Sequence, residues 1–352
     1  MRAVIGLFVM TRIGLLATIL AATVSVPPSA VAARNSDIPL LNALAQWDGG
    51  AYLYLAQHGY SAENANYASY FPLYPLLMKL GGTLLGGSTD AYLIVGVLIA
   101  NLATLAALAG LLRLGSQQRA TLIAAAGYIL VFPTTIFLSA VYADALFLML
   151  IIGSAVAAER AAWWRAGALA AAAALTRPFG AVAVIPLAVA VWQARARSSR
   201  ALMAIALTPA AFVAFVVYLY ALTGDPLAVV HAYSSGFTPR QPLQSLTDLF
   251  DPAVYGFPWL IGGAFVITVA LVVLSWRRTT PPLAAYATAM LLVITLAGSL
   301  ASSMRYELSL FPMFIALAAA VRRPVMRAAW VIGSALLAAL FAAMFALGYW
   351  VG

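Results

Sequence analysis

The residues best suited to chemistry lie early in the chain, in the run Gln46-Trp47-Asp48 and the aromatic stretch that follows it. Asp48 opens the aromatic-rich part of a segment, residues 40–58, that is predicted to be helical. A carboxylate near a helix N-terminus is favoured by the helix dipole, which keeps it ionised. Nearby aromatic rings can stack on sugars, and they can equally form an interfacial belt in which Asp48 only caps the helix. Composition alone leaves both interpretations open.

The histidines and several acids are the candidate metal ligands of the chain. His58 and His231 are the only histidines. Lone histidines in predicted loops are more often ordinary polar residues than ligands, and His58 is the better candidate because it shares the segment of Asp48. Four acids could supply oxygen ligands to a divalent cation. These are Asp48, Glu63, Asp144 and Asp225. No ligand spacing supports such a site, so we expect that no cofactor is required, with a divalent metal as the open alternative.

The elements that position these residues follow from composition. The chain has 352 residues, of which 64% are apolar and 8% charged, and no cysteine. Soluble domains carry about a quarter charged residues, so this content excludes an ordinary soluble fold. The apolar runs are continuous and rich in alanine and leucine, whereas a membrane β-barrel has short alternating segments. We predict an all-α polytopic membrane protein with one transmembrane domain over residues 1–352.

Eleven apolar runs are candidate transmembrane helices, since a bilayer core of about 30 Å needs roughly twenty helical residues. They lie near residues 3–26, 91–112, 120–138, 143–158, 163–176, 178–194, 201–222, 257–276, 281–300, 307–321 and 327–350. Two long loops then fall on the outer side, residues 27–90 and 223–256. Loops of this length in a compact protein are usually functional. An amphipathic stretch over 73–85 is predicted to lie on the membrane surface.

The placement of charges tests this topology. With the N-terminus in the cytoplasm, thirteen basic residues fall on the cytoplasmic side: Arg2, Arg113, Arg119, Arg160, Arg165, Arg195, Arg197, Arg200, Arg277, Arg278, Arg322, Arg323 and Arg327. Five fall outside: Arg34, Lys79, Arg177, Arg240 and Arg305. Arg12 lies inside the first span, and Glu159 is the only one of the ten acids placed inside. This is a positive-inside bias. The net charge of +9 is therefore a topology signal, and no nucleic-acid partner is expected.

The bias also predicts a break at Thr176-Arg177-Pro178. A single helix over 163–194 would move later arginines outside and reverse the distribution. Proline ends a helix because it lacks an N–H and its ring clashes with the preceding turn. We therefore expect an outward-facing turn here, with Arg177 at its tip.

Several motifs, taken in order, resemble the PIG-V-type mannosyltransferases, which are integral-membrane GT-C glycosyltransferases. The first loop has Trp47-Asp48, then Ala56-Gln57-His58-Gly59-Tyr60, Glu63 and Phe71-Pro72-Leu73-Tyr74-Pro75. Later matches are Ser139-Ala140-Val141-Tyr142-Ala143-Asp144-Ala145-Leu146-Phe147, Thr176-Arg177-Pro178-Phe179-Gly180, Gly224-Asp225-Pro226-Leu227, and Arg305 with Phe311-Pro312. Two positions depart from the eukaryotic pattern: Ala51 replaces a histidine, and the acid at Asp144 replaces a glutamate.

The resemblance implies a GT-C fold of about eleven transmembrane helices with short interfacial helices in the first outer loop. It also implies an inverting transfer of a hexose, mannose by preference, from a polyprenyl-phosphate-sugar donor. The acceptor is a glycan or glycolipid hydroxyl outside the membrane. Under this interpretation Asp48 is the general base, because the acceptor hydroxyl needs a base at hydrogen-bond distance. Arg177 and Arg305 hold the lipid phosphate, which suits the planar guanidinium fork.

Other substrate-binding candidates surround these residues. They are Trp47, His58, Tyr60, Tyr74, Tyr142 and Asp144. The alternatives are ordinary structural roles: belt positions for the tyrosines, snorkelling for Arg177, and an ion pair with Asp144 or Glu307 for Arg305. Two other functions stay open, a transporter or lipid flippase without chemistry and a GT-C enzyme for another lipid-linked sugar. Short loops favour the cytoplasmic membrane of a bacterium, with membrane lipids around the chain.

Overall fold

The computed structural model describes residues 1–236, 242–247, 249–251, 257–297 and 300–351. Within these ranges the fold consists of helices, with no strand. The all-α prediction is confirmed, and the chain is a polytopic membrane protein. Part of the predicted second outer loop, 223–256, lies outside the described residues, and so does Arg240.

Five helices in the described ranges are long and apolar enough to cross a membrane. They are α1 (Arg2–Ser25), α5 (Thr89–Leu111), α10 (Ser199–Thr223), α13 (Pro258–Arg278) and α17 (Pro324–Ala346). Each coincides with a predicted apolar run, and each exceeds the roughly twenty residues that a bilayer core requires.

The other six predicted runs form shorter helices. Their main helices are α6 (Arg119–Val131), α7 (Asp144–Glu159), α8 (Trp163–Ala174), α9 (Val184–Gln193), α14 (Pro281–Leu296) and α16 (Phe311–Ala320). Short helical pieces adjoin several of them: η2 (Thr135–Leu138), η3 (Pro178–Ala183) and α15 (Ser303–Glu307). Prolines stand at several of these breaks, including the predicted one, where α8 ends at Ala174 and η3 begins at Pro178. The number of crossings and their direction stay predictions.

The segment predicted to be the first outer loop, residues 27–90, is largely helical, and one expectation about it was wrong. The side of the membrane on which it lies stays a prediction. The predicted continuous helix over 40–58 is two helices, α2 (Pro39–Leu44) and α3 (Asp48–His58). The chain bends at Trp47, whose φ of +56° is rare for a non-glycine residue. The buried Gln46 secures the bend, because its amide bonds the backbone N–H and carbonyl of Ala33 at 2.9 Å each. As a result, Asp48 is the first residue of a helix.

The rest of this loop packs against the bundle. It contains η1 (Ala65–Tyr67) and α4 (Leu73–Leu84). The amphipathic stretch predicted at 73–85 is a helix, and its buried side, including Tyr74 and Met78, contacts α5. Its location on the membrane surface stays a prediction. In the second outer loop, α11 (Ala228–Gly236) and α12 (Pro242–Thr247) are described.

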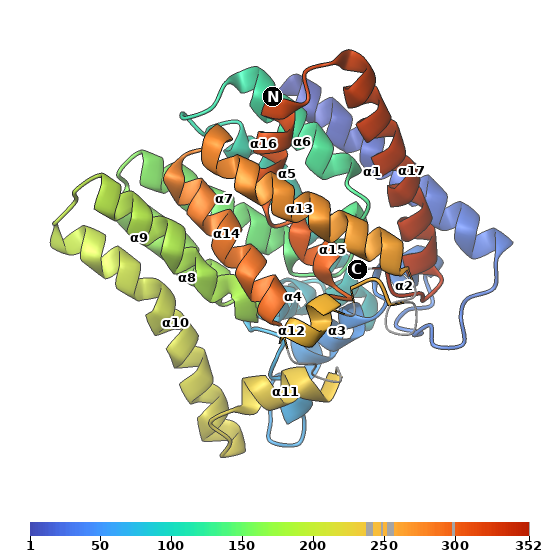
Figure 1. Cartoon of the computed structure of the whole chain (residues 1–352). Coiled ribbons are helices and arrows are strands. Elements are labelled where there is room, and N and C mark those ends of the chain that lie inside the picture. Colours follow the sequence, from blue (N-terminus) through green and yellow to red (C-terminus); the bar gives the residue numbers. More distant parts are fainter. Residues whose placement is uncertain (237–241, 248, 252–256, 298–299, 352) are drawn as a thin grey trace.

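Helix α7 forms the centre of the bundle, packed between α5 and α8 (Figure 1). Helices α1 and α17 lie together on one side, and α10 packs on α8 at the opposite edge. The short elements α3, α4, α11 and α12 gather at one end of the bundle with α15 (Figure 1). The N-terminal ends of α3 and α7, the turn before η3, and α15 are the elements that carry the candidate site.

Candidate active site

Arg305 is the central residue of a buried ion-pair network. Its Nη1 lies 2.5 Å from Oδ2 of Asp48, and its Nη2 lies 3.0 Å from Oδ2 of Asp144. The Nε of Arg305 donates to Asp144 as well, at 3.2 Å to Oδ2. The guanidinium group of Arg305 therefore binds Asp144 through Nε and Nη2 and binds Asp48 through Nη1. A lysine ammonium lacks this planar set of donors.

Arg177 joins the same network from the other side of Asp144. Its Nη1 donates to Oδ1 of Asp144 at 2.8 Å. The side chains of Arg177, Arg305 and Asp144 are only 6%, 4% and 3% exposed, whereas that of Asp48 is 22% exposed. Buried charges are stable only when they are paired and hydrogen-bonded. Asp144 meets this condition with two guanidinium partners, and Asp48 is the acid that solvent and ligands reach.

Local structure explains why the two acids point to one place. Asp48 begins α3 and Asp144 begins α7, so each carboxylate lies at the positive end of a helix dipole. The hydroxyl of Tyr142 connects the two ends, because it accepts from the backbone N–H of Asp48 at 3.1 Å and donates to the carbonyl of Gln46 at 3.2 Å. The ring of Tyr142 also packs under Arg305, whose Cζ is 4.5 Å from the ring centroid.

A cavity of about 280 Å³ opens beside this network. Asp48, Arg177 and Arg305 line it, while Asp144 lies behind them. Its wall is rich in aromatic rings: Tyr52, Tyr67, Tyr70, Phe179, Tyr233, Tyr306 and Trp350. Ser302 lines it too, and its buried hydroxyl has no hydrogen-bond partner in the described part of the chain. Charged groups among aromatic faces in a concave site are typical of a sugar and phosphate pocket.

Tyr70 makes the closest polar contact with Asp48 after Arg305. Its hydroxyl donates to Oδ1 of Asp48 at 3.2 Å. Burial, and then the negative charge of Asp48, hold the pKa of the Tyr70 hydroxyl well above its usual range. Tyr70 therefore stays a neutral donor. Tyr70 directly precedes the motif Phe71-Pro72-Leu73-Tyr74-Pro75, and this position was the sequence signal that could have identified it as a site residue.

Five other predicted binding residues lie outside the cavity wall. Trp47 is 40% exposed and meets Trp350 edge to face. His58 is exposed at the C-terminal end of α3 and stacks on Tyr54. The hydroxyl of Tyr60 donates to the carbonyl of Tyr70 at 2.6 Å.

The remaining two, Tyr74 and Tyr142, are fully buried. Tyr74 donates to the carbonyl of Gly96 at 3.0 Å, deep between α4 and α5. These contacts support the structure of the site and give neither tyrosine a face on the cavity.

The four acids that could have bound a cation are not gathered. Asp48 and Asp144 are joined through Arg305, Glu63 is exposed, and Asp225 pairs with His231, whose Nδ1 lies 2.7 Å from Oδ2. No group of three or more potential ligands occurs in the described ranges.

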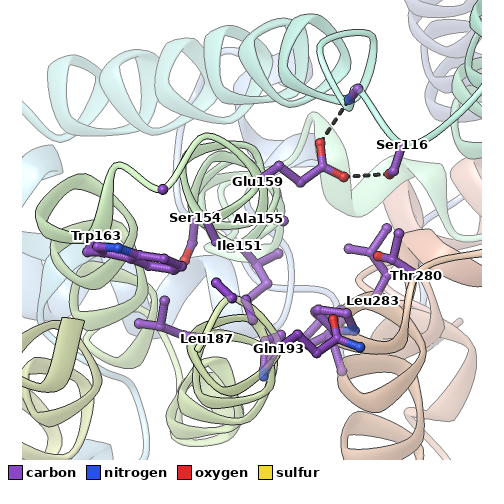
Figure 2. A pocket seen from close by; sticks show the side chains of 18 of the residues that line it. Ser116, Ile151, Ser154, Ala155, Glu159, Trp163, Leu187, Gln193, Thr280 and Leu283 are labelled. Atoms are coloured by element: carbon purple, nitrogen blue, oxygen red, sulfur yellow. Dashed lines mark hydrogen bonds between the residues drawn. The ribbon is translucent and has the colours of Figure 1, made fainter. Parts of the chain in front are cut away.

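A second cavity, of about 440 Å³, lies between α7, α8, α9 and α14 (Figure 2). It adjoins Glu159, at the opposite end of α7 from Asp144, which places it about 24 Å away along a helix of 16 residues. The carboxylate of Glu159 accepts from the hydroxyl of Ser116 at 2.5 Å and from the N–H of Gly115 at 2.8 Å (Figure 2). With its one acid satisfied and no cation in its wall, this cavity lacks the groups for phosphate or sugar chemistry.

Comparison with known proteins identifies the same family that the order of the sequence motifs indicates. A family model described as Mannosyltransferase (PIG-V) matches residues 6–235, which is more than half of the chain. The chain belongs to this family. The PIG-V match includes Asp48, Asp144 and Arg177, and it ends before Arg305.

Curated relatives come from the same family. The proteins named GPI alpha-1,6-mannosyltransferase 2 from Mus musculus and Rattus norvegicus are each 36% identical to this chain over 156 residues. That from Cricetulus griseus is 35% identical over the same length. Each alignment covers 41% of this chain and 31% of the relative, so the match spans less than a third of those PIG-V proteins.

Proposed function

We propose that this protein transfers mannose, with inversion, from a polyprenyl-phosphate-mannose donor to the hydroxyl of a glycan or glycolipid acceptor. The observation that carries the proposal is the cavity beside α3, where Asp48, Arg177 and Arg305 face one space of about 280 Å³. A base for a hydroxyl and cations for a departing phosphate are the two requirements of this transfer. Family membership supports the choice of mannose.

Asp48 acts as the general base in this proposal. It is the more exposed of the two acids, and it lies on the cavity wall at the start of α3. As the acceptor oxygen bonds to C1 of the sugar, its proton passes to Asp48. The bond from C1 to the phosphate oxygen breaks, and the electron pair leaves with the lipid phosphate. No protein acid is needed, because the phosphate is already a good leaving group.

Arg177 and Arg305 stabilise the phosphate as it departs. Arg177 uses one nitrogen for Asp144, which leaves other N–H groups of its fork at the cavity wall. Arg305 is engaged by both acids, so an arriving phosphate exchanges places with a carboxylate. The aromatic wall, including Tyr306 and Trp350, offers faces for the sugar ring.

The acceptor class and the side of the membrane are part of the proposal. The relatives are named for the GPI glycolipid, and a hydroxyl of a glycolipid or glycan suits a cavity bordering the membrane. A cytoplasmic N-terminus, with the cavity on the opposite face of a bacterial cytoplasmic membrane, is the orientation that we propose, and the positive-inside bias supports it. A divalent cation is not needed for the steps above.

The decisive experiment compares Asp48→Asn with Asp37→Asn in purified protein supplied with polyprenyl-phosphate-[³H]mannose and membrane glycolipids. Asp37 is an exposed acid of the same loop and serves as the matched control. We expect Asp48→Asn to lose at least about a hundredfold in rate while still binding donor, because a general base contributes that much. Full turnover by Asp48→Asn would remove the base assignment.

A further inference from the structure

A third cavity, of about 330 Å³, lies between α13, α16 and α17, on the other side of α15 from the candidate active site. Ser302, Arg305 and Tyr306 line the catalytic cavity, whereas Met304 and Glu307 line this one. Along α13 the wall runs from Trp259 to Leu271, which corresponds to about 18 Å of helix. The cavity is thus long enough for a lipid chain, and nothing in the proposed transfer uses it.

Glu307 is the unusual residue of this wall. Its side chain is 1% exposed, and neither carboxylate oxygen has a hydrogen-bond partner in the described part of the chain. The hydroxyl of Thr268 is close enough to influence the carboxyl group but does not reach hydrogen-bond geometry. A buried polar group without a partner is costly and rare in native proteins. The wall also includes Trp330, whose buried indole N–H has no partner among the residues that the structure describes.

The cavity is accessible from the membrane side of the bundle. Ile267 of α13 is 46% exposed and Gly333 of α17 is exposed, and both residues belong to the cavity wall. The faces of α13 and α17 beside it carry further exposed apolar residues, such as Val266 and Ile332. A hydrocarbon chain therefore has a route from the bilayer into the space between these helices.

Charge selects the class of lipid. No Lys, Arg or His lines the cavity among the described residues, so a phosphate or other anionic head has no cationic partner there, and the carboxyl group of Glu307 disfavours a second anion. A hydroxyl is complementary, because it can donate to a carboxyl oxygen of Glu307 in either protonation state. We propose that this cavity is a binding site for a neutral lipid with a hydroxyl head, of the diacylglycerol type. The site is separate from the phosphate-carrying donor, and the inference does not rest on mannosyl transfer.

The test is photocrosslinking in nanodiscs with 1-oleoyl-2-acyl-glycerol carrying a diazirine in the acyl chain, with crosslinked peptides located by mass spectrometry. We expect crosslinks in α13 and α17 that excess dioleoylglycerol removes, and that hexadecane or dioleoylphosphatidic acid leaves in place. Equal competition by hexadecane would show an unselective apolar void and overturn the proposal.

Substitutions at Glu307 and at Gly333 test the contribution of the carboxyl group and that of the cavity volume separately. Glu307→Leu keeps the volume without the polar head contact and should bind the probe at least about tenfold more weakly, while Glu307→Gln should bind within about threefold of the unmodified protein. Gly333→Leu should abolish specific labelling, because a Cβ at Gly333 meets open space and a larger side chain fills the cavity. Gly14→Leu, a change at an equally open glycine of α1, is the control. Unchanged labelling in Glu307→Leu or Gly333→Leu would overturn the inference.

Discussion

Arg305 holds Asp48 by an ion pair of 2.5 Å between Nη1 and Oδ2, across 257 residues of sequence. The contact joins the first outer loop to the short helix α15 near the end of the bundle. The proposed base and a proposed phosphate ligand therefore depend on each other for position. Several measurements follow from this relationship and from its neighbours.

Arg305→Lys should lower the mannosyl-transfer rate by at least about a hundredfold. A lysine ammonium is a point charge and cannot bind Asp48 and Asp144 together as the guanidinium fork does. The loss of a positioned donor to a developing anion has effects of this size. Arg34→Lys, at an exposed arginine outside the cavity wall, is the matched control. Wild-type kinetics in Arg305→Lys would show that the fork geometry is not used.

Tyr70→Phe should slow transfer by about three- to tenfold and leave donor affinity nearly unchanged. It removes the hydroxyl that donates to Asp48 at 3.2 Å, a contact worth about 1 kcal/mol. Because burial raises the pKa of Tyr70 well above its usual range, the hydroxyl does not titrate near neutrality, and the ratio of rates should be constant from pH 6 to 9. Tyr54→Phe, outside the cavity wall, controls for the loss of a hydroxyl in α3. A ratio that changes across this range would contradict the assignment.

Arg12→Leu should lower the free energy of unfolding by about 1–3 kcal/mol, measured by thermal or denaturant unfolding in detergent. Arg12 is 7% exposed within α1, and its guanidinium donates to Ser139 at 2.6 Å and to the side chain of Thr135 at 3.1 Å. Its removal takes away the donor to the buried hydroxyl of Thr135, while Ser139 keeps its hydrogen bond to Oδ1 of Asn101 at 3.0 Å. Arg2→Leu changes an exposed arginine at the start of the same helix and should have little effect. Equal stability of the two variants would show that the Arg12 contacts contribute nothing net.

The contact between Asp225 and His231 should make the start of α11 sensitive to acid. The hydrogen bond from His231, and then that from the N–H of Leu227 at 2.9 Å, hold the pKa of the Asp225 carboxyl below its usual value. A lowered folded-state pKa stabilises above the unfolded value of about 3.9 and is lost as the pH falls through the folded value. Hydrogen exchange at the Leu227 amide should therefore lose protection only below about pH 3.9. In Asp225→Asn the protection should be weaker and flat with pH, and the same acid transition in that variant would assign it to another group.

Much of the fold could be predicted from the sequence because its cause is local. Apolar length places a helix at each of the eleven runs, and Pro178 marks the predicted interruption, because proline lacks an N–H and its ring clashes with the preceding turn. The break between α15 and α16, within the predicted run 307–321, was not predicted. The bend at Trp47 was not predicted, because no local sequence preference indicates a positive φ at a tryptophan. It depends on Gln46 reaching the backbone of Ala33, a contact between segments.

The candidate site was predictable to a similar extent. Outer charges are scarce, so Asp48, Asp144, Arg177 and Arg305 stood out, and the structure brings all four together. Their catalytic and binding roles stay predictions. Tyr306 was missed because the side of the short helix α15 that faces the cavity depends on the rotation of that helix. Trp350 was missed because it follows the end of α17 at Ala346, where the course of the chain has no periodic signal in the sequence. Tyr74 was chosen by motif, yet its hydroxyl points to the carbonyl of Gly96 in the interior.

The two carboxylates and two guanidinium groups of the network have opposite and equal charge. A phosphate that enters the cavity thus finds no uncompensated positive charge. At Arg177 it can use N–H groups that Asp144 leaves open, whereas at Arg305 it must replace a carboxylate. The affinity for the phosphate is therefore the gain from its new ion pairs minus the loss of the ion pairs that the carboxylate made. Once the sugar has been transferred, the displaced carboxylate competes with the product phosphate for the guanidinium group. Under the proposed reaction, this exchange would keep the product phosphate weakly held and favour rapid release over tight capture.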